Sequence, residues 1–364
     1  MKGLILPVFL VILLSQAVGS SGQQNQARIG PGDEFTTVSY TYSYKSPAPQ
    51  DIADLRRAAE TGDPLAENNL GYAYALGQGV APDREDAVKW LNRAVASGFV
   101  PAQFNLGVLY EYGYGVPQDY ARALASFQAA ARQGFVRAEA KLGLFYENGW
   151  AVPADPKQAV QWFRTAADHG DAEAQCELGN QYHEGSGVPR DDTEAAKLYR
   201  QAADRGYAPA QNNMGALYRQ GLGVKQDYDA AITWYRRAFE NGLADAANNL
   251  GVMYEDGTGV EKDYGQAAAW YRLAAVHGAP RGQFNLATLY YTGRGVPLDY
   301  VSAYVWYSRA AATGDRMAAR RAKEVASIMT AKEKQLAKSR LLDRQDAQVS
   351  DAETHSPFDG ASRK

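Results

Sequence analysis

The side chains that could support catalysis or hold a metal ion are few and widely spaced in this sequence. They are four histidines and one cysteine, namely His169, His183, His277, His355 and Cys176. Glu184 follows His183, but the second histidine that completes the HExxH motif of a zinc hydrolase is absent. No GxSxG nucleophile motif, phosphate-binding loop or CxxC pair occurs. The sequence therefore predicts a protein that is not an enzyme and that has no catalytic residue, metal site or cofactor.

The residues that resemble fragments of catalytic motifs lie where helices are expected to end or begin. His169 and His277 each precede a glycine at a predicted helix end, where a histidine interacts favourably with the terminal carbonyl groups. Asp191 and Asp192 lie at a predicted helix start, where a carboxylate caps backbone N–H groups. The recurring Gly-x-Gly turns follow helices and lack the third glycine of a dinucleotide-binding loop. A structural role is expected for each of these residues.

Composition narrows the class of partner. The chain has 41 acidic and 38 basic side chains, a net charge of -3, and so lacks the basic excess of a nucleic-acid-binding protein. We therefore expect no nucleic-acid partner.

A single cysteine, Cys176, allows no internal disulfide, so packing alone has to stabilise the fold.

The first 22 residues have the layout of a secretory signal peptide. A short positive start, Met1-Lys2, precedes the apolar run 4–14, and small residues surround a cleavage point after Gly19. An uncleaved anchor is the alternative, but the run is shorter than the roughly 20 residues that a membrane-spanning helix needs. We expect residues 1–19 to be removed, the protein to be secreted or periplasmic, and no transmembrane segment to remain after cleavage.

A strict internal repeat with a step of 36 residues dominates the rest of the chain. Its clearest column is a leucine–glycine pair with conservative replacements, at Leu70-Gly71, Leu106-Gly107, Leu142-Gly143, Leu178-Gly179, Met214-Gly215, Leu250-Gly251 and Leu286-Ala287. Columns of valine, aspartate and glycine that begin at Val80, Asp83 and Gly98 keep the same step. This period is typical of helical solenoids, in which a repeat buries its apolar face only by stacking on its neighbours.

Each repeat is predicted to contain two helices joined by a glycine turn. In the first copy, Leu70 and Tyr74 form part of one apolar stripe on a helix over about 64–76. The Gly-x-Gly sequence at 77–79 ends this helix, because glycine tolerates the left-handed cap conformation. Asp83 is expected to cap the second helix, whose buried face carries an aromatic column that begins at Trp90.

The ends of the array are atypical, as is expected for terminal repeats. Residues 51–62 read as a lone second helix, and residues 20–50 before it as a flexible tether. Residues 316–344 are predicted to form capping helices, the second opened by a capping box from Thr330 to Glu333. These helices carry many basic residues, which we interpret as the solvated face of a cap. A site for a membrane surface or an acidic partner is the alternative. The tail 345–364 is predicted to be disordered.

These motifs resemble the Sel1-like repeats, which are relatives of the tetratricopeptide repeats. Residues 244–278 carry the pattern nearly whole, from Leu250-Gly251 through Asp263-Tyr264 to Trp270-Tyr271. Small departures occur at Ala151, Pro156 and Ala287. The resemblance covers about residues 51–315. It implies an all-α fold, a right-handed α/α superhelical solenoid of seven 36-residue helix-turn-helix repeats with an extra N-terminal helix and C-terminal capping helices.

The resemblance also implies a function. It is that of a non-enzymatic protein-interaction scaffold or adaptor of the bacterial cell envelope, with a partner bound in a concave groove. One branch of the family, marked by cysteine pairs that bridge helices, is linked to penicillin binding and β-lactam hydrolysis. Because Cys176 has no second cysteine, a periplasmic hydrolase acting on cell-wall or β-lactam substrates is kept only as an alternative. An exopolysaccharide assembly component is a further alternative.

The expected groove follows from helix geometry. On the first helix of each copy, the positions equivalent to 68, 72 and 75 fall opposite the apolar stripe. These columns vary between copies far more than the core columns do. The predicted partner-binding residues are Asn68, Tyr72, Phe104, Glu111, Tyr112, Glu147, Asn180, Asn212, Arg219, Asn248, Glu255 and Phe284. Their mildly acidic character predicts a basic protein or peptide partner, with an envelope polysaccharide or a merely solvated helix face as alternatives.

A neighbouring column is rich in asparagine, at Asn69, Asn105, Asn213, Asn249 and Asn285, and is interrupted by Lys141 and Glu177. Asparagine is not a strong helix former, so a specific hydrogen bond is expected. The favoured interpretation is a structural bond to a neighbouring loop of the stack. Recognition of the backbone of a bound peptide is the alternative.

Overall fold

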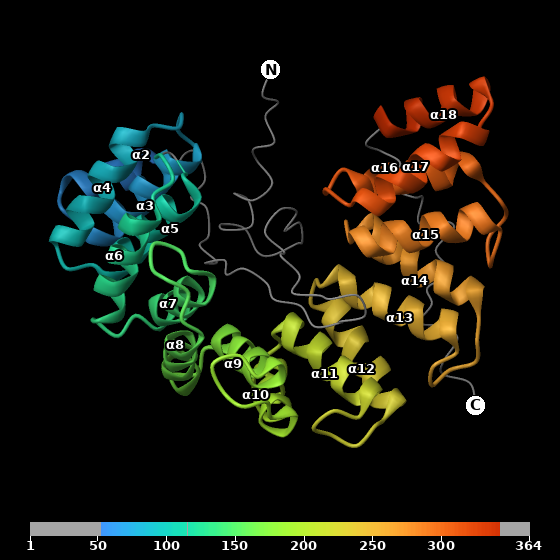
Figure 1. The fold of residues 1–364 in the computed structure, drawn as a ribbon. Helices are drawn as coiled ribbons and strands as arrows, with labels where there is room; N and C mark the ends of the chain where they lie inside the picture. Colours follow the sequence, from blue (N-terminus) through green and yellow to red (C-terminus); the bar gives the residue numbers. More distant parts are fainter. Residues whose placement is uncertain (1–51, 115, 343–364) are drawn as a thin grey trace. The chain divides into compact units, whose positions relative to one another are not determined.

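The computed structural model describes residues 52–114 and 116–342, and these residues form seventeen α-helices and no strand (Figure 1). The chain divides into two compact units, whose described parts are residues 52–114 with 116–205, and residues 206–342. The predicted signal peptide 1–19, tether 20–50 and tail 345–364 lie outside the described residues.

The first unit contains nine of these helices. They are α2 (Ile52–Glu60), α3 (Pro64–Leu76), α4 (Arg84–Ala96), α5 (Val100–Tyr112), α6 (Tyr120–Ala131), α7 (Val136–Asn148), α8 (Pro156–Asp168), α9 (Ala172–Glu184) and α10 (Asp192–Asp204). The second unit contains eight, which are α11 (Ala208–Gln220), α12 (Tyr228–Glu240), α13 (Ala244–Asp256), α14 (Tyr264–Val276), α15 (Pro280–Thr292), α16 (Tyr300–Ala311), α17 (Arg316–Ile328) and α18 (Ala331–Leu342).

The helix order confirms the predicted solenoid. The odd-numbered helices from α3 to α15 are the first helices of the seven repeats, here called A helices, and the even-numbered ones from α4 to α16 are the second, or B, helices. The lone helix before the array is α2, and the capping helices are α17 and α18. The predicted capping box is present, since Thr330 N donates to Glu333 Oε2 at 2.7 Å and Glu333 N donates to Thr330 Oγ1 at 3.3 Å.

The turns between the two helices of a repeat have the predicted chemistry. Gly77 ends α3 in the left-handed conformation, with φ 68°. Asp83 caps α4 by accepting hydrogen bonds from the backbone N–H groups of Glu85 and Asp86 at 2.9 and 3.0 Å. An aspartate caps all seven B helices in the same way. Where one turn has Ala151 in place of its second glycine, the alanine still adopts φ 61°, a conformation that is unfavourable for any residue with a Cβ.

The leucine–glycine column marks the closest approach of the two helices in each repeat. A Cβ atom added to Gly143 on α7 would lie 2.4 Å from Cε1 of Phe163 on α8, a residue that is fully buried. Gly107, Gly179, Gly215 and Gly251 each face an aromatic ring of their own B helix in the same way. In these five repeats the glycine leaves the space that the aromatic ring fills, and in the first repeat Gly71 faces Leu91 instead.

We expect Gly143→Ala to destabilise the first unit by about 1–3 kcal/mol, the usual cost of overpacking, although alanine is the better helix former by about 1 kcal/mol. Unfolding in denaturant, followed by circular dichroism, measures the loss. The matched variant Gly143→Ala/Phe163→Leu removes the ring that the methyl group meets. Its two effects should therefore be less than additive, and strict additivity would show that the contact with Phe163 is not the cause.

Candidate interaction surface

The A helices are more deeply enclosed than the sequence predicted. Seven of the twelve predicted binding residues are buried, namely Asn68, Tyr72, Phe104, Glu111, Asn180, Asn212 and Asn248. The expectation that these positions are free of the core is therefore wrong. A single helical wheel considers only the partner helix of the same repeat, whereas an A helix also contacts the A helices of adjacent repeats, as α3 contacts α5 and α13 contacts α15. Phe104, for example, packs between Phe127 and Phe135.

The asparagine column joins successive A helices. Asn105 on α5 donates to Oδ1 of Asn68 on α3 at 2.8 Å. Asn249 donates to Asn212, and Asn285 to Asn248, at the same distance of 2.8 Å. The structural interpretation is confirmed for these pairs, but the partner is the next A helix and not a loop. Each bond supplies a partner for an amide that stacking removes from water.

Between the second and third repeats, where no asparagine is present to accept the hydrogen bond, a charged pair takes the place of the amide pair. Phe104 occupies the acceptor column of the second repeat, and the residue stacked beyond it is Lys141 on α7. Lys141 Nζ reaches Oε1 of Glu111 on α5 at 2.9 Å, with 2% and 4% of the two side chains exposed. Burial by itself would lower the pKa of Lys141, but Glu111, Tyr112 and Glu173 together outweigh it and raise the pKa. Lys141 also contacts the ring and the hydroxyl group of Tyr112.

The three glutamates among the predicted binding residues are engaged within the protein. Glu111 binds Lys141, and Glu147 accepts a hydrogen bond from Gln181 of the next repeat. Glu255 accepts a hydrogen bond of 2.6 Å from the hydroxyl group of Tyr271. These contacts remove the main support for a basic partner. Asn180 is likewise occupied, because Tyr199 donates to its Oδ1 at 2.7 Å.

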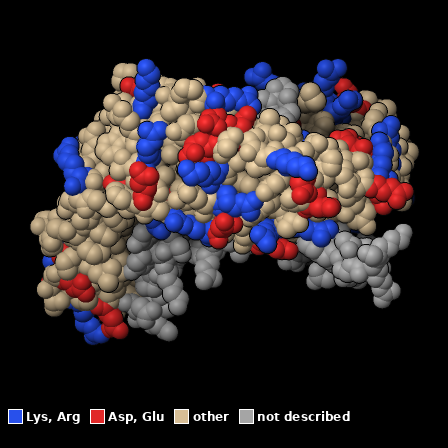
Figure 2. Space-filling view, turned by 90° about the horizontal axis from the view of Figure 1, so that it is seen from below, with Lys and Arg blue, Asp and Glu red and all other residues tan. Residues whose placement is uncertain are grey.

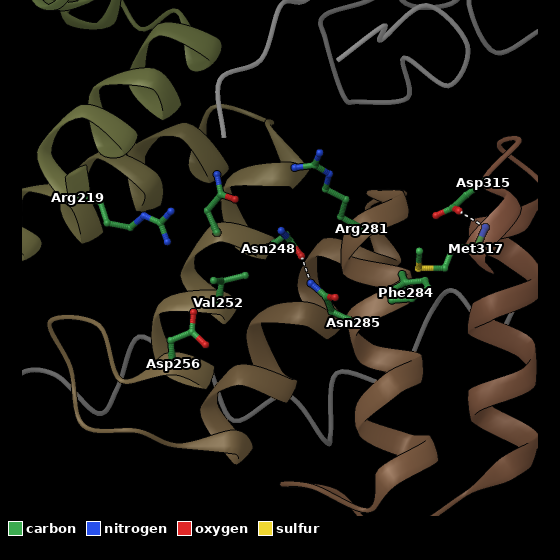
Figure 3. Close-up of a pocket in the computed structure, with 10 residues that line it drawn as sticks. Arg219, Asn248, Val252, Asp256, Arg281, Phe284, Asn285, Asp315 and Met317 are labelled. Atoms are coloured by element: carbon green, nitrogen blue, oxygen red, sulfur yellow. Dashed lines mark hydrogen bonds between the residues drawn. The ribbon is translucent and has the colours of Figure 1, made fainter. Parts of the chain in front are cut away.

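Three of the twelve predicted residues come together in the second unit. Arg219, Asn248 and Phe284 line a cavity of about 430 Å³ between α11, α13, α15 and α17 (Figure 3). The other lining residues are Asn249, Val252, Asp256, Arg281, Asn285, Asp315 and Met317. The sequence prediction missed Arg281 and Met317, because they lie in the first turns of their helices, outside the columns chosen for the groove.

His169 and His277 take the structural places that the sequence predicted. His169 and His277 are the C-terminal cap residues of α8 and α14. His183 Nδ1 lies 2.6 Å from Oδ1 of Asp192 at the start of α10. Within residues 52–114 and 116–342, no group of three or more histidine, cysteine or acidic side chains is placed to hold a metal ion. In the same residues, no helix has the length and apolar character needed to span a membrane.

Charge is distributed without a dominant sign on the face shown in Figure 2, where lysine and arginine side chains are interspersed with aspartate and glutamate. This face has no extended basic stripe of the kind that binds nucleic acid. Local combinations of side chains, such as those of the cavity in the second unit, therefore have to provide specificity.

Comparison with known proteins identifies the repeat. A family model described as Sel1 repeat matches seven consecutive segments, residues 64–99, 100–135, 136–171, 172–207, 208–243, 244–278 and 280–315. No curated protein matches the chain.

Several solved structures are similar. A Sel1 repeat protein from Oxalobacter formigenes is 34% identical with a TM-score of 0.60, over 76% of this chain and 80% of that chain. A protective antigen present in uropathogenic Escherichia coli strains, which displays an SLR fold, is 26% identical with a TM-score of 0.38, over 82% of this chain and 94% of that chain. An immunity protein from Pseudomonas aeruginosa is 20% identical with a TM-score of 0.44, over 59% and 81% of the two chains.

The contribution of the buried Lys141–Glu111 pair to the free energy of unfolding can be measured. We expect Lys141→Met to destabilise the first unit by about 3–5 kcal/mol, because Glu111 is then left as an unpaired buried charge. Lys141→Met/Glu111→Leu removes both charges and should recover most of this loss. Denaturant unfolding of the wild type and the three variants, including Glu111→Leu alone, completes the cycle. A double variant as unstable as the sum of the singles would mean that the pair makes no net contribution.

Glu173, on α9, predicts a pH dependence. Burial, reinforced by Asp171 and opposed by Lys141, raises the pKa of Glu173 well above its ordinary value. The folded state therefore holds this proton more tightly than the unfolded state. The free energy of unfolding should fall as the pH rises from about 4.3, the ordinary pKa of glutamate, through the raised pKa. Glu173→Gln cannot ionise, so it should be more stable than the wild type at pH 7 and equal to it near pH 4.

Thermal unfolding at pH 4, 5.5 and 7 measures this difference. Glu60→Gln, at an exposed position in the same unit, is the matched control and should follow the wild type at every pH. An advantage of Glu173→Gln that is as large at pH 4 as at pH 7 would contradict ionisation as its cause.

Proposed function

The chain belongs to the Sel1 repeat family, and from this premise we propose that it is a non-enzymatic scaffold of the bacterial cell envelope that binds a partner protein. The Sel1 repeat fold is typically a protein-interaction scaffold without catalytic function. In this chain the partner would bind on the surface of the A helices, and chiefly at the cavity of the second unit. This cavity is the observation that carries the proposal.

The cavity has the mixed chemistry of a protein-binding site. It combines amides, two arginines and the apolar side chains of Val252, Phe284 and Met317. Met317 is 63% exposed, although a large apolar side chain at this position gives the isolated protein no packing advantage. Arginine, aromatic residues and methionine are enriched in protein interfaces, and a flexible methionine adapts to the shape of a partner.

Two of the alternative functions have lost support. An exopolysaccharide-binding platform would need exposed aromatic rings; Phe104 and Tyr72 are buried in the core of the first unit, whereas Tyr112, Tyr291 and Phe284 are partly exposed. A hydrolase would need a nucleophile with an adjacent base, and His183 is instead held by Asp192 at the start of a helix. No specific observation favours either function over a scaffold.

Placement in the envelope follows from residues 1–19, whose composition is that of a secretory signal peptide. Removal of this segment would leave a mature chain that begins at Ser20. The absence of a disulfide is compatible with an exported protein, because the repeats are held together by packing and by the polar pairs between A helices.

Site-specific photocrosslinking in the producing cell tests the proposal. A benzoylphenylalanine at position 317 lies at the cavity, whereas the same residue at position 233 lies on the exposed side of α12, a B helix. We expect a protein adduct from position 317 and none from position 233. The adduct should occur in the envelope fraction and contain a chain that begins at Ser20.

Two results would contradict the proposal in different ways. Equal adducts from both positions, or none from position 317, would argue against binding at the A helices. An adduct that contains the uncleaved chain and remains in the cytoplasm would argue against placement in the envelope, while leaving the scaffold function intact.

A further inference from the structure

Large apolar side chains that are exposed gather on the last two helices of the described chain. Seven such side chains are exposed among the described residues, and five of them belong to α17 and α18, namely Met317, Ile328, Leu336, Leu341 and Leu342. Met317 borders the cavity described above, but the other four do not. A single exposed apolar residue is ordinary, whereas several on two consecutive helices indicate an interaction surface.

One side of α18 has no neighbouring helix among the described residues. Each B helix of the array packs against the A helix of the next repeat, as α16 packs against α17. Helix α18 also packs against α16, and its buried residue Ala337 belongs to the same apolar cluster as Val305 and Val325. Within the described chain no helix follows α18, which lies at the end of the second unit (Figure 1).

The side of α18 opposite Ala337 is here called the outer face of α18. Helix geometry places on it the residues Ala331, Lys332, Gln335, Leu336, Lys338, Ser339 and Leu342. All seven are exposed. The outer face therefore combines two leucines with two lysines, and it contains no acidic residue.

The two helices carry a strong excess of positive charge. They contain two acidic residues, Glu324 and Glu333, and eight basic ones, which are Arg316, Arg320, Arg321, Lys323, Lys332, Lys334, Lys338 and Arg340. Both carboxylates have partners within the protein, because Glu324 pairs with Arg320 and Arg321 at 3.1 and 3.0 Å and Glu333 accepts a hydrogen bond from Thr330 at 2.8 Å. By contrast, the chain as a whole has a net charge of -3.

The acidic groups near α18 lie away from its outer face. Glu333 and Arg340 are only partly exposed and are not on this face. Asp299 lies close enough to Glu333 to act on it electrostatically, but it caps α16 and accepts a hydrogen bond of 2.6 Å from Ser302 Oγ. Arg340 donates to the same hydroxyl group at 3.2 Å. Among the described residues, Lys332 and Lys338 have no ion pair, so their charges face the solvent.

This chemistry favours a lipid surface over an acidic protein or a second copy of the chain. Lysine is a point charge on a flexible stem, whereas a carboxylate in a fixed position is typically bound by the planar fork of arginine. The stems of Lys332 and Lys338 let their ammonium groups reach phosphate headgroups while leucines enter the apolar boundary below. A second copy would bring two positive surfaces together, which is unfavourable.

We propose that the outer face of α18 binds the surface of an anionic membrane. Lys332 and Lys338 contact the phosphate groups of the lipids, and Leu336 and Leu342 enter the boundary between headgroups and acyl chains. The proposal takes the membrane-surface interpretation of the basic C-terminal helices in place of the solvated cap. It goes beyond the proposed scaffold function, because it requires neither a protein partner nor the cavity of the second unit.

Co-sedimentation with vesicles tests the proposal. The chain from Ser20, which lacks the apolar run 4–14, is mixed with vesicles of phosphatidylcholine alone or of phosphatidylcholine with about one third phosphatidylglycerol. We expect the affinity for the anionic vesicles to be at least about tenfold higher than for the neutral ones, and added salt to weaken the binding.

Two double variants separate the contributions of charge and apolar contact. Lys332→Glu/Lys338→Glu should lower the affinity for the anionic vesicles by about tenfold or more, because it reverses both charges of the outer face. Leu336→Gln/Leu342→Gln should lower it by about fivefold or more, since the apolar contact is lost while the charges remain. The salt dependence of the second variant should therefore persist.

Two matched controls change the same residue types at other exposed positions. Lys157→Glu/Lys225→Glu makes an equal change in net charge, and both lysines are exposed. Leu65→Gln/Leu298→Gln removes the two exposed large apolar side chains that lie outside α17 and α18 among the described residues. Both controls should bind like the wild type. Circular dichroism checks that every variant folds, and the salt dependence of the wild type needs no variant.

Four results would overturn the proposal. Two are equal or undetectable binding to both kinds of vesicle, and an affinity that falls as much in the controls as in the variants of α18. Binding of soluble polyglutamate without binding of vesicles would assign the lysines to an acidic protein. A dimer seen in sedimentation velocity and lost in Leu336→Gln/Leu342→Gln would assign the leucines to a second copy. None of these results bears on the adduct from position 317, so the scaffold function is tested separately.

Discussion

The structure depends on the contact between a glycine of the A helix and an aromatic ring of the B helix that follows it, which recurs in the second to sixth repeats. The missing side chain at Gly143 allows Phe163 to lie against the backbone of α7, and the same arrangement recurs from repeat to repeat. A methyl group at this position would occupy the space of the ring. The contact therefore sets how closely the two helices pack, and the strict spacing of the leucine–glycine column reflects this steric requirement.

Close packing within repeats has a consequence between them. Once the A helices also pack against one another, polar side chains on their flanks lose contact with water and need partners inside the stack. The asparagine pairs supply these partners where both columns hold asparagine. Where Phe104 removes the acceptor, Lys141 instead binds Glu111, which costs desolvation of two charges but leaves each with a counter-charge. The polar residues of these columns thus serve mainly to join adjacent A helices, and binding of a partner is left to the side chains that this role does not occupy.

The use of polar side chains between stacked helices explains why one part of the A helices is a better candidate for binding than the rest. In the first unit, the predicted binding residues are largely used in packing, as with Phe104, or in polar pairs, as with Asn68 and Glu111. In the second unit, Arg219, Phe284 and Met317 border a cavity, and Asn248 contributes both to the stack and to the cavity wall. We expect a partner to bind where side chains of the A helices are not used entirely in contacts between the stacked helices.

The sequence by itself determined the repeat, the bounds of its helices and the chemistry of its turns. These features depend on local interactions, such as the cap formed by Asp83 and the left-handed turn at Gly77, which act within a few residues and recur every 36 positions. Only the tertiary structure decided which variable positions are accessible. Asn68 and Asn248 occupy the same column, yet Asn248 borders the cavity of the second unit, whereas Asn68 is bonded to Asn69 and Asn105, and Arg281 joins the cavity from a column that the periodicity did not single out. The reason is that burial on the A helices is set by the side chains of neighbouring repeats. One position can therefore face a phenylalanine, a charged pair or an open cavity, depending on residues that are 36 or more positions away.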